Sequence, residues 1–122
     1  MLRASYVMTF YILLKSDSTI NYYYNGEGLK KKQKAVGGLI QPVYLTTGVT
    51  AYLNENGINE NLSVNDIATT NFKLNGVFDK YLFVDKEVRG NVLYEFETKD
   101  LYESFKLSFE LAKMVQKLEK TA

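Results

Sequence analysis

Residues 7–14 (VMTFYILL) form an almost uninterrupted apolar run that is rich in β-prone side chains. Such a run is typical of a strand in the middle of a sheet, which is buried on both faces. It is shorter than the ~20 residues that span a bilayer, and no small-residue cleavage site of a secretory signal follows it. We therefore expect a central strand here, with residues 1–7 as an N-terminal extension.

Further strands and turns follow from alternation and from turn residues. Residues 19–24 alternate in polarity after a turn at 16–18, which predicts a hairpin with the first strand. Pro42 lacks a backbone N–H, so the strand around it should lie at an edge of the sheet. Asn75-Gly76 is a candidate hairpin turn. The predicted later strands are 38–45, 49–54 and 92–98, with one or two more over 72–78 and 81–85.

Two helices complete the predicted fold, with a short turn of helix over 66–70 capped by Ser63 or Asn65. A basic helix should follow Asn25-Gly26 and end at Gly37, where a left-handed residue is wanted. A long helix should run from Asp100 to Lys120. The sequence predicts one α+β domain over residues 1–122, with a mixed or mainly antiparallel sheet of about five to six strands.

The residue types that are absent narrow the possible chemistry. The chain has no Cys, so disulfides, thiolate catalysis and cysteine metal sites are excluded. It has no His, which removes the commonest general base and zinc ligand. We therefore expect a non-enzymatic cytoplasmic protein without metal or cofactor. Glu95 and Glu97 share a strand face, which leaves carboxylate chemistry as a minor alternative. A net charge of +1 gives no general attraction for double-stranded DNA or acidic membranes.

A basic, aromatic segment is the first candidate binding site. Lys30, Lys31 and Lys34 lie on one side of the predicted basic helix, and Tyr23 precedes it on a strand. Lysines bind phosphates and tyrosines stack on bases, so these residues and Arg89 are candidate nucleotide ligands. The alternatives are a solvated charged face and tyrosines that only cover a sheet.

An Asn-rich loop is the second candidate. Asn54 and Asn65 bound it, and their side-chain amides offer the donors and acceptors that suit a base or a sugar. The alternative is that these residues bond to their own backbone in turns, as Asn commonly does. The sequence leaves both readings open.

Several of these elements resemble a known family in their order along the chain. The elements are Val36-Gly37-Gly38 with its aliphatic strand, Asn54-Glu55-Asn56-Gly57, and Leu62 with Asn65 before a small helix. Over about residues 8–85 the chain resembles the domain-of-unknown-function 3846 family of phages, prophages and mobile elements. Ser63 stands where that family usually has Pro, and Asp66 where a basic residue is common. The resemblance implies a phage accessory protein and carries no established activity.

The long C-terminal helix carries two apolar stripes, although packing on its own sheet needs only one. The first comprises Leu101, Tyr102, Phe105, Phe109 and Ala112. The second comprises Leu107, Leu111, Met114, Val115 and Leu118. An exposed apolar stripe marks an interface, so we expect a homo-oligomer, most simply a dimer, unless one subunit covers both stripes.

Together these observations favour a phage counter-defence protein that sequesters a small nucleotide-type immune signal in the host cytoplasm. The alternative is a protein-interaction module that inhibits or recruits a host protein. The two differ in partner, since a small molecule should co-purify in the first case and one stoichiometric protein in the second.

Overall fold

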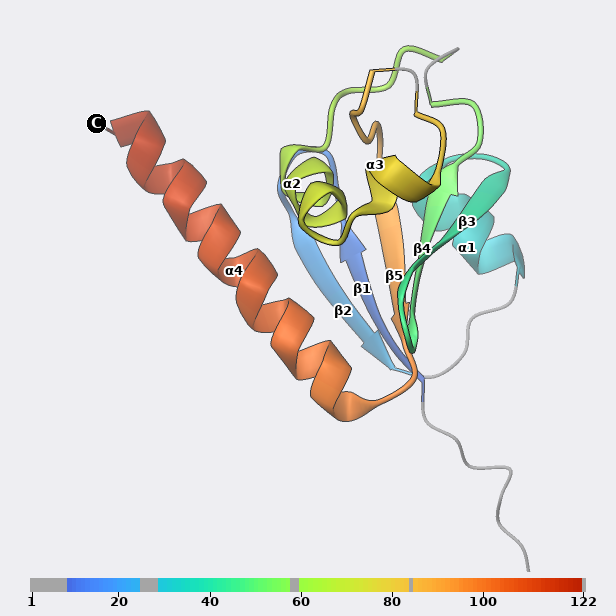
Figure 1. The fold of residues 1–122 in the computed structure, drawn as a ribbon, viewed down its shortest axis with the longest axis horizontal. Coiled ribbons are helices and arrows are strands. Elements are labelled where there is room, and N and C mark those ends of the chain that lie inside the picture. Colours follow the sequence, from blue (N-terminus) through green and yellow to red (C-terminus); the bar gives the residue numbers. More distant parts are fainter. Residues whose placement is uncertain (1–8, 25–28, 58–59, 84, 122) are drawn as a thin grey trace, which may run out of the picture.

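The computed structural model describes residues 9–24, 29–57, 60–83 and 85–121. These residues form one antiparallel sheet in the order β2-β1-β5-β4-β3 (Figure 1). The strands are β1 (Phe10–Leu14), β2 (Ile20–Tyr24), β3 (Ile40–Thr46), β4 (Val49–Asn54) and β5 (Val92–Phe96). The helices are α1 (Leu29–Val36), α2 (Asp66–Leu74), α3 (Val77–Lys80) and α4 (Lys99–Thr121). The α+β fold predicted from the sequence is confirmed.

Strand β5 joins two hairpins into one sheet. Strands β1 and β2 form the first hairpin, and β3 and β4 form the second. Phe96 of β5 is paired with Phe10 of β1 on one side and with Val49 of β4 on the other. Pro42 lies in β3, which is an edge strand as its missing N–H requires.

The larger core lies on the sheet face that α2, α3 and α4 cover. Alternate residues of β1 and β5 point into it, including Ile12 and Tyr94, which are fully buried. The Tyr94 ring packs against Phe109 of α4, with ring centroids 4.8 Å apart, and against Phe72 of α2. Burying such aromatic side chains contributes roughly 1.5–3 kcal/mol each. This core holds the three helices on the sheet.

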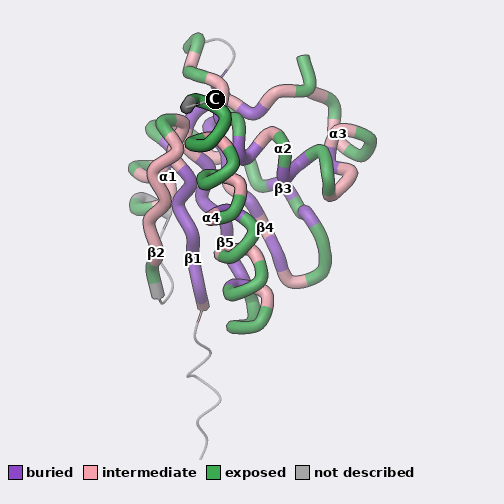
Figure 2. The backbone as a smooth tube through the Cα atoms, turned by 90° about the vertical axis from the view of Figure 1, so that its left-hand side faces the viewer, coloured by how far each residue is buried: buried purple, intermediate pink, exposed green. Residues whose placement is uncertain are grey.

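The smaller core lies on the opposite face, under α1. Tyr11, Leu13 and Leu93 point to this side and are buried together with Val36 of α1. Strand β1 is therefore apolar on both faces because it is covered on both, as its continuous apolar run predicts. Figure 2 shows β1 and β5 buried along most of their lengths.

Helix α4 confirms one predicted stripe as core and exposes the other. The stripe from Leu101 to Ala112 packs on the sheet, with Tyr102 and Phe109 buried. The side chains of the second stripe are each more than half exposed, and Figure 2 looks onto this outer side of α4. The second stripe therefore does not contribute to the core of its own subunit.

The prediction of one or two strands over 72–78 and 81–85 is wrong. The Asn65 side chain accepts a hydrogen bond from the Ala68 N–H at 3.1 Å and caps helix α2, which buries Phe72 at helical spacing. Asn75-Gly76 ends α2 rather than turning a hairpin, and Gly76, with a φ of 70°, leads into α3. Residues 81–83 form no strand. The run at 72–78 instead spans the end of α2 and the start of α3, with Phe72 and Val77 buried and Leu74 exposed.

Candidate functional site

A groove of about 480 Å³ lies on the α1 side of the sheet, between α1 and the β1–β2 hairpin. Strand β1 forms part of its floor, because its alternate residues Tyr11 and Leu13 point to this face. Lys15, directly after the strand, has the same parity and also lines the groove. Its remaining walls come from β2, from α1 and from the start of β5. The lining residues are Tyr11, Leu13, Lys15, Tyr23, Lys31, Lys34, Ala35, Asn91 and Leu93.

The charge of this groove is positive. Lys31 and Lys34 of α1 line it from one side, and Lys15 lines it from the end of β1. Neither Lys15 nor Lys34 forms an ion pair within the described part of the chain. No described Asp or Glu lines the groove. Ammonium groups that line an open groove attract anions.

Two tyrosines give the groove an aromatic side. Tyr11 of β1 and Tyr23 of β2 are directly paired across the hairpin, so both side chains point to the same sheet face. Tyr11 is buried, whereas Tyr23 is 41% exposed and presents its ring to the groove. The Tyr11 hydroxyl donates to Glu95 Oε2 at 3.3 Å, which holds the ring in place.

A polar cluster beneath α1 engages Glu95. The Tyr52 hydroxyl donates to Glu95 Oε1, and Lys32 Nζ lies 3.6 Å from the same oxygen and 4.3 Å from the centre of the Tyr52 ring. Burial, and next the hydrogen-bonded Glu95 carboxylate, raise the pKa of Tyr52. The carboxylate of Glu95 therefore contacts three polar groups, those of Tyr11, Tyr52 and Lys32. These contacts hold Tyr11 and the Lys32 side chain of α1 in place.

Asn91 fastens the end of α1 to the sheet. Its side-chain N–H donates to the Ala35 carbonyl at 3.1 Å, and its side-chain oxygen accepts from the Ser16 N–H at 3.2 Å. Both of these partners lie beside the groove, since Ala35 lines it and Ser16 follows Lys15. Asn91 therefore links α1, which forms one wall of the groove, to the end of β1, which forms part of its floor.

The sequence matches the family described as Domain of unknown function (DUF3846) over residues 10–106. The chain belongs to this family. The match is wider than the resemblance at about 8–85 and includes β5 and the first part of α4. No curated protein and no solved structure matches the sequence.

The residues that carry the DUF3846 resemblance contact one another. The Asn54 side-chain N–H donates to the Val36 carbonyl at 3.2 Å and to Glu60 Oε1 at 3.4 Å, and its oxygen accepts from the Asn56 N–H at 2.7 Å. A side chain at Gly38 would meet the Asn54 amide, since a Cβ there would lie 3.0 Å from its nitrogen. In this DUF3846 protein the two motifs hold the end of α1 against β4.

Asn65 also bonds to backbone. Besides capping α2, its side-chain N–H donates to the carbonyls of Leu14 and Gly90, both at 2.9 Å. Asn54 and Asn65 are both buried, and neither lines the lysine groove. Of the two readings of the Asn-rich loop, these contacts favour the one in which Asn bonds to backbone.

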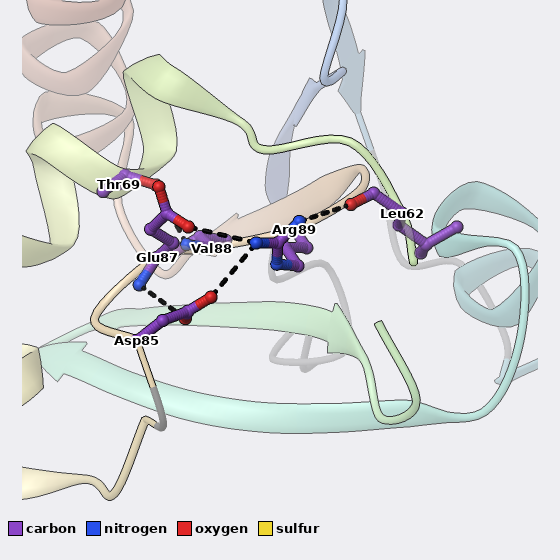
Figure 3. A network of polar contacts seen from close by, with 6 residues as sticks. All are labelled: Leu62, Thr69, Asp85, Glu87, Val88 and Arg89. Carbon is purple, nitrogen blue, oxygen red and sulfur yellow. Dashed lines mark hydrogen bonds and ion pairs between the residues drawn. The ribbon is translucent and has the colours of Figure 1, made fainter. Parts of the chain in front are cut away.

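Arg89 lies in a different part of the molecule. Its guanidinium forms ion pairs with Asp85 and Glu87, each at 3.1 Å, and donates to the Leu62 carbonyl at 3.1 Å (Figure 3). The nearby guanidinium lowers the pKa of Asp85. Arg89 lines a separate groove with Asn54 rather than the lysine groove. Its charge is engaged in joining loops, as Figure 3 shows.

The structure brings together only some of the predicted ligand residues. Tyr23, Lys31 and Lys34 meet in one groove, while the side chain of Lys30 lies outside the described residues. Sequence reasoning missed Lys15 and Tyr11. Both are on the same strand parity, so the period of two along residues 11–15 could have placed them beside Tyr23.

The described residues contain no cluster of acidic side chains that could hold a metal ion. Among their helices, none combines the length and apolarity needed to cross a bilayer.

Proposed function

We propose that this protein binds a small nucleotide-type ligand in the lysine–tyrosine groove, without catalysing a reaction. The observation that carries the proposal is the meeting of Lys15, Lys31 and Lys34 with the exposed ring of Tyr23 in one groove. A nucleotide combines an anionic phosphate, which ammonium groups attract, with a planar base, which an aromatic ring stacks on.

The residues near the groove support binding over catalysis. The chain has no His or Cys to act as base or nucleophile. The carboxylate of Glu95, beneath α1, accepts hydrogen bonds from Tyr11 and Tyr52 and pairs with Lys32. A binding protein of this kind acts by lowering the free concentration of its ligand.

The biological setting is an extension of the proposal and rests on the family resemblance. A phage accessory protein that holds a nucleotide in the host cytoplasm would remove a signal that the host uses for immunity. Sequestration needs affinity and abundance rather than turnover, which fits a small chain without His or Cys.

Calorimetry and thermal shift against cyclic and linear adenine nucleotides test the proposal. We expect micromolar or tighter binding that weakens as salt is added, because the contacts to phosphate are ionic. Lys15→Gln and Lys34→Gln should each weaken binding about tenfold, which corresponds to ~1.4 kcal/mol. Tyr23→Ala should weaken it by a similar factor, since stacking on a base contributes roughly 1–3 kcal/mol.

Matched controls separate the groove from general charge and aromatic effects. Lys73→Gln and Tyr44→Ala change exposed residues that do not line the groove, and should leave affinity unchanged. The combined change of Lys30, Lys31 and Lys34 to Gln should alter stability by less than about 1 kcal/mol. Binding no tighter than millimolar would refute the proposal, and a stoichiometric host protein in a pull-down would favour the interaction-module alternative.

A further inference from the structure

The second stripe of α4 is a surface feature that nucleotide binding does not use. Leu107, Leu111, Met114 and Leu118 are 60%, 52%, 58% and 67% exposed. The part of the helix that bears them, residues 107–118, lies beyond the DUF3846 match at 10–106. Large exposed apolar side chains gathered on one helix face mark an interaction surface.

The spacing of the stripe matches that of a helix pair. Its four seam residues are separated by four, three and four positions, which is the alternation of a coiled-coil seam. Tyr102 and Phe109 occupy a different side of α4, where they are buried against the sheet. Helix α4 therefore has one side for its own subunit and another with the geometry to pack on a helix.

We propose that a second copy of this chain packs on the stripe, with the two α4 helices antiparallel about a two-fold axis. In this arrangement Leu111 lies opposite the partner's Met114, and Leu107 lies opposite the partner's Leu118. Each seam layer then contains two large apolar side chains. The stripe is self-complementary, because the same two layers recur on both sides of the axis.

The charges beside the seam favour this direction. Glu110 and Lys117 each precede a seam residue, so both flank the seam on the same side. In the antiparallel register, Glu110 of each chain lies beside Lys117 of the other, which gives two opposite-charge pairs. A parallel pair would instead place Glu110 beside Val115 and leave its charge without a partner across the seam.

The position of Glu110 is restricted before pairing. Its carboxylate accepts a hydrogen bond from the Tyr22 hydroxyl, and Lys106 Nζ lies 4.9 Å from the centre of the Tyr22 ring. Less side-chain freedom is therefore lost when Glu110 meets Lys117. The other flank carries Ser108 and Val115, which are neutral, so no like charges oppose the pairing.

The seam is short, which sets the expected strength. Its eleven helical steps from Leu107 to Leu118 correspond to roughly 16 Å of helix at ~1.5 Å per residue. An interface of this length falls at the small end of specific interfaces. We expect a dimer that forms at tens of micromolar and dissociates on dilution.

Single-cysteine variants test the orientation, since the chain has no cysteine of its own. A mixture of Leu107→Cys and Leu118→Cys proteins should give a disulfide-linked heterodimer on mild oxidation. Leu107→Cys alone should not crosslink, because its two sulfurs would lie about 16 Å apart along the axis. Efficient self-crosslinking of Leu107→Cys would indicate a parallel pair and overturn the proposal.

Sedimentation equilibrium tests the assembly and its charges. The wild type should show twice its 14.0 kDa mass at a few hundred micromolar. Lys117→Glu should weaken the dimer several-fold, while Lys113→Glu, which changes the same charge away from the seam, should not. Leu111→Glu with Leu118→Glu should give a folded monomer by circular dichroism. A wild-type protein that stays monomeric at these concentrations refutes the proposal. A stripe that binds a host protein and never a second copy of this chain refutes it as well.

Discussion

The side-chain amide of Asn54 donates to the carbonyl oxygen of Val36 at the end of α1, 3.2 Å away and 18 residues earlier in the chain. The bond joins two of the motifs by which the DUF3846 family is recognised. It satisfies a helix-end carbonyl that lacks a partner within the helix. The motif residues therefore hold the helix that forms one wall of the lysine groove.

Replacing Asn54 with Ala should lower stability without changing the chemistry of the groove. Asn54 is buried and bonded on both sides of its amide, so we expect a loss of about 1–3 kcal/mol, measured by urea unfolding. Asn56→Ala is the matched control, because the Asn56 side chain makes no hydrogen bond in the described part of the chain. An Asn54→Ala variant with an unchanged free energy of unfolding would contradict this structural role.

Gly48→Ala should destabilise the protein more than Gly37→Ala. Both glycines have a φ of 81°, which disfavours any L side chain by roughly 1–2 kcal/mol. A Cβ at Gly48 would also lie 2.8 Å from Leu101 Cδ1 of α4, whereas one at Gly37 would have no atom within 4 Å. We expect a further loss of about 1 kcal/mol from the clash.

A double-mutant cycle isolates the clash at Gly48. In a Leu101→Ala background the obstructing methyl is absent, so Gly48→Ala should cost no more than Gly37→Ala does. Equal losses at both glycines in the wild-type background would show that Leu101 moves aside freely.

Asn21→Val should stabilise the protein. The side-chain oxygen of Asn21 is buried and accepts no hydrogen bond within the described residues. Asn21 is paired with Leu13 across the hairpin, so its side chain points to the same apolar face. Removing an unsatisfied buried oxygen and adding a β-branched side chain should contribute up to about 1 kcal/mol. Thermal unfolding measures the change.

The control for this substitution is Asn91→Val. The Asn91 amide makes two hydrogen bonds, so the same replacement should destabilise by about 1–3 kcal/mol. If both variants lost stability equally, the Asn21 oxygen would have to be hydrogen-bonded in solution.

Stability should fall as the pH rises above about 10. Burial raises the pKa of Tyr22, Tyr52 and Tyr94 in the folded protein, and hydrogen-bonded carboxylates raise those of Tyr22 and Tyr52 further. Unfolded tyrosines ionise near pH ~10. Above that pH the folded state binds more protons than the unfolded state, so the free energy of unfolding decreases with pH.

Urea unfolding across the alkaline range measures this decrease, with tyrosinate absorbance to follow ionisation. Tyr52→Phe should give a shallower decrease than the wild type, because one group with a raised pKa is lost. Below the range in which unfolded tyrosine titrates, these three groups should contribute no pH dependence. Identical slopes for wild type and variant would contradict the contribution of Tyr52.

Periodicity predicted the elements in which one physical pattern dominates. The apolar run of β1 and the first stripe of α4 each follow a single rule of burial, and both are buried in the structure. Residues 72–78 fit two patterns at once. Phe72, Leu74 and Phe78 have the alternation of one strand face, whereas Phe72 also follows Ala68 at helical spacing and is buried with it. The Asn65 cap decides between them, and its partners lie on β1 and before β5.

The candidate site depends on contacts that spacing does not show. The pairing of Tyr11 with Tyr23 could be predicted from the hairpin, which would have placed Lys15 near the groove as well. The position of α1 could not be predicted in this way, because it depends on a hydrogen bond from Asn91, more than fifty residues away, to the end of the helix. The ion pairs that engage Arg89 likewise come from a loop whose path the sequence leaves open.

The place of β5 has a consequence for synthesis on the ribosome. It is the last strand to be made and lies between two hairpins completed long before it, so β1 and β4 emerge with one open edge each. Such edges can pair with other chains until a native strand fills them. The nascent protein is therefore most prone to misassociate after residue 54 and before residue 96 has left the exit tunnel.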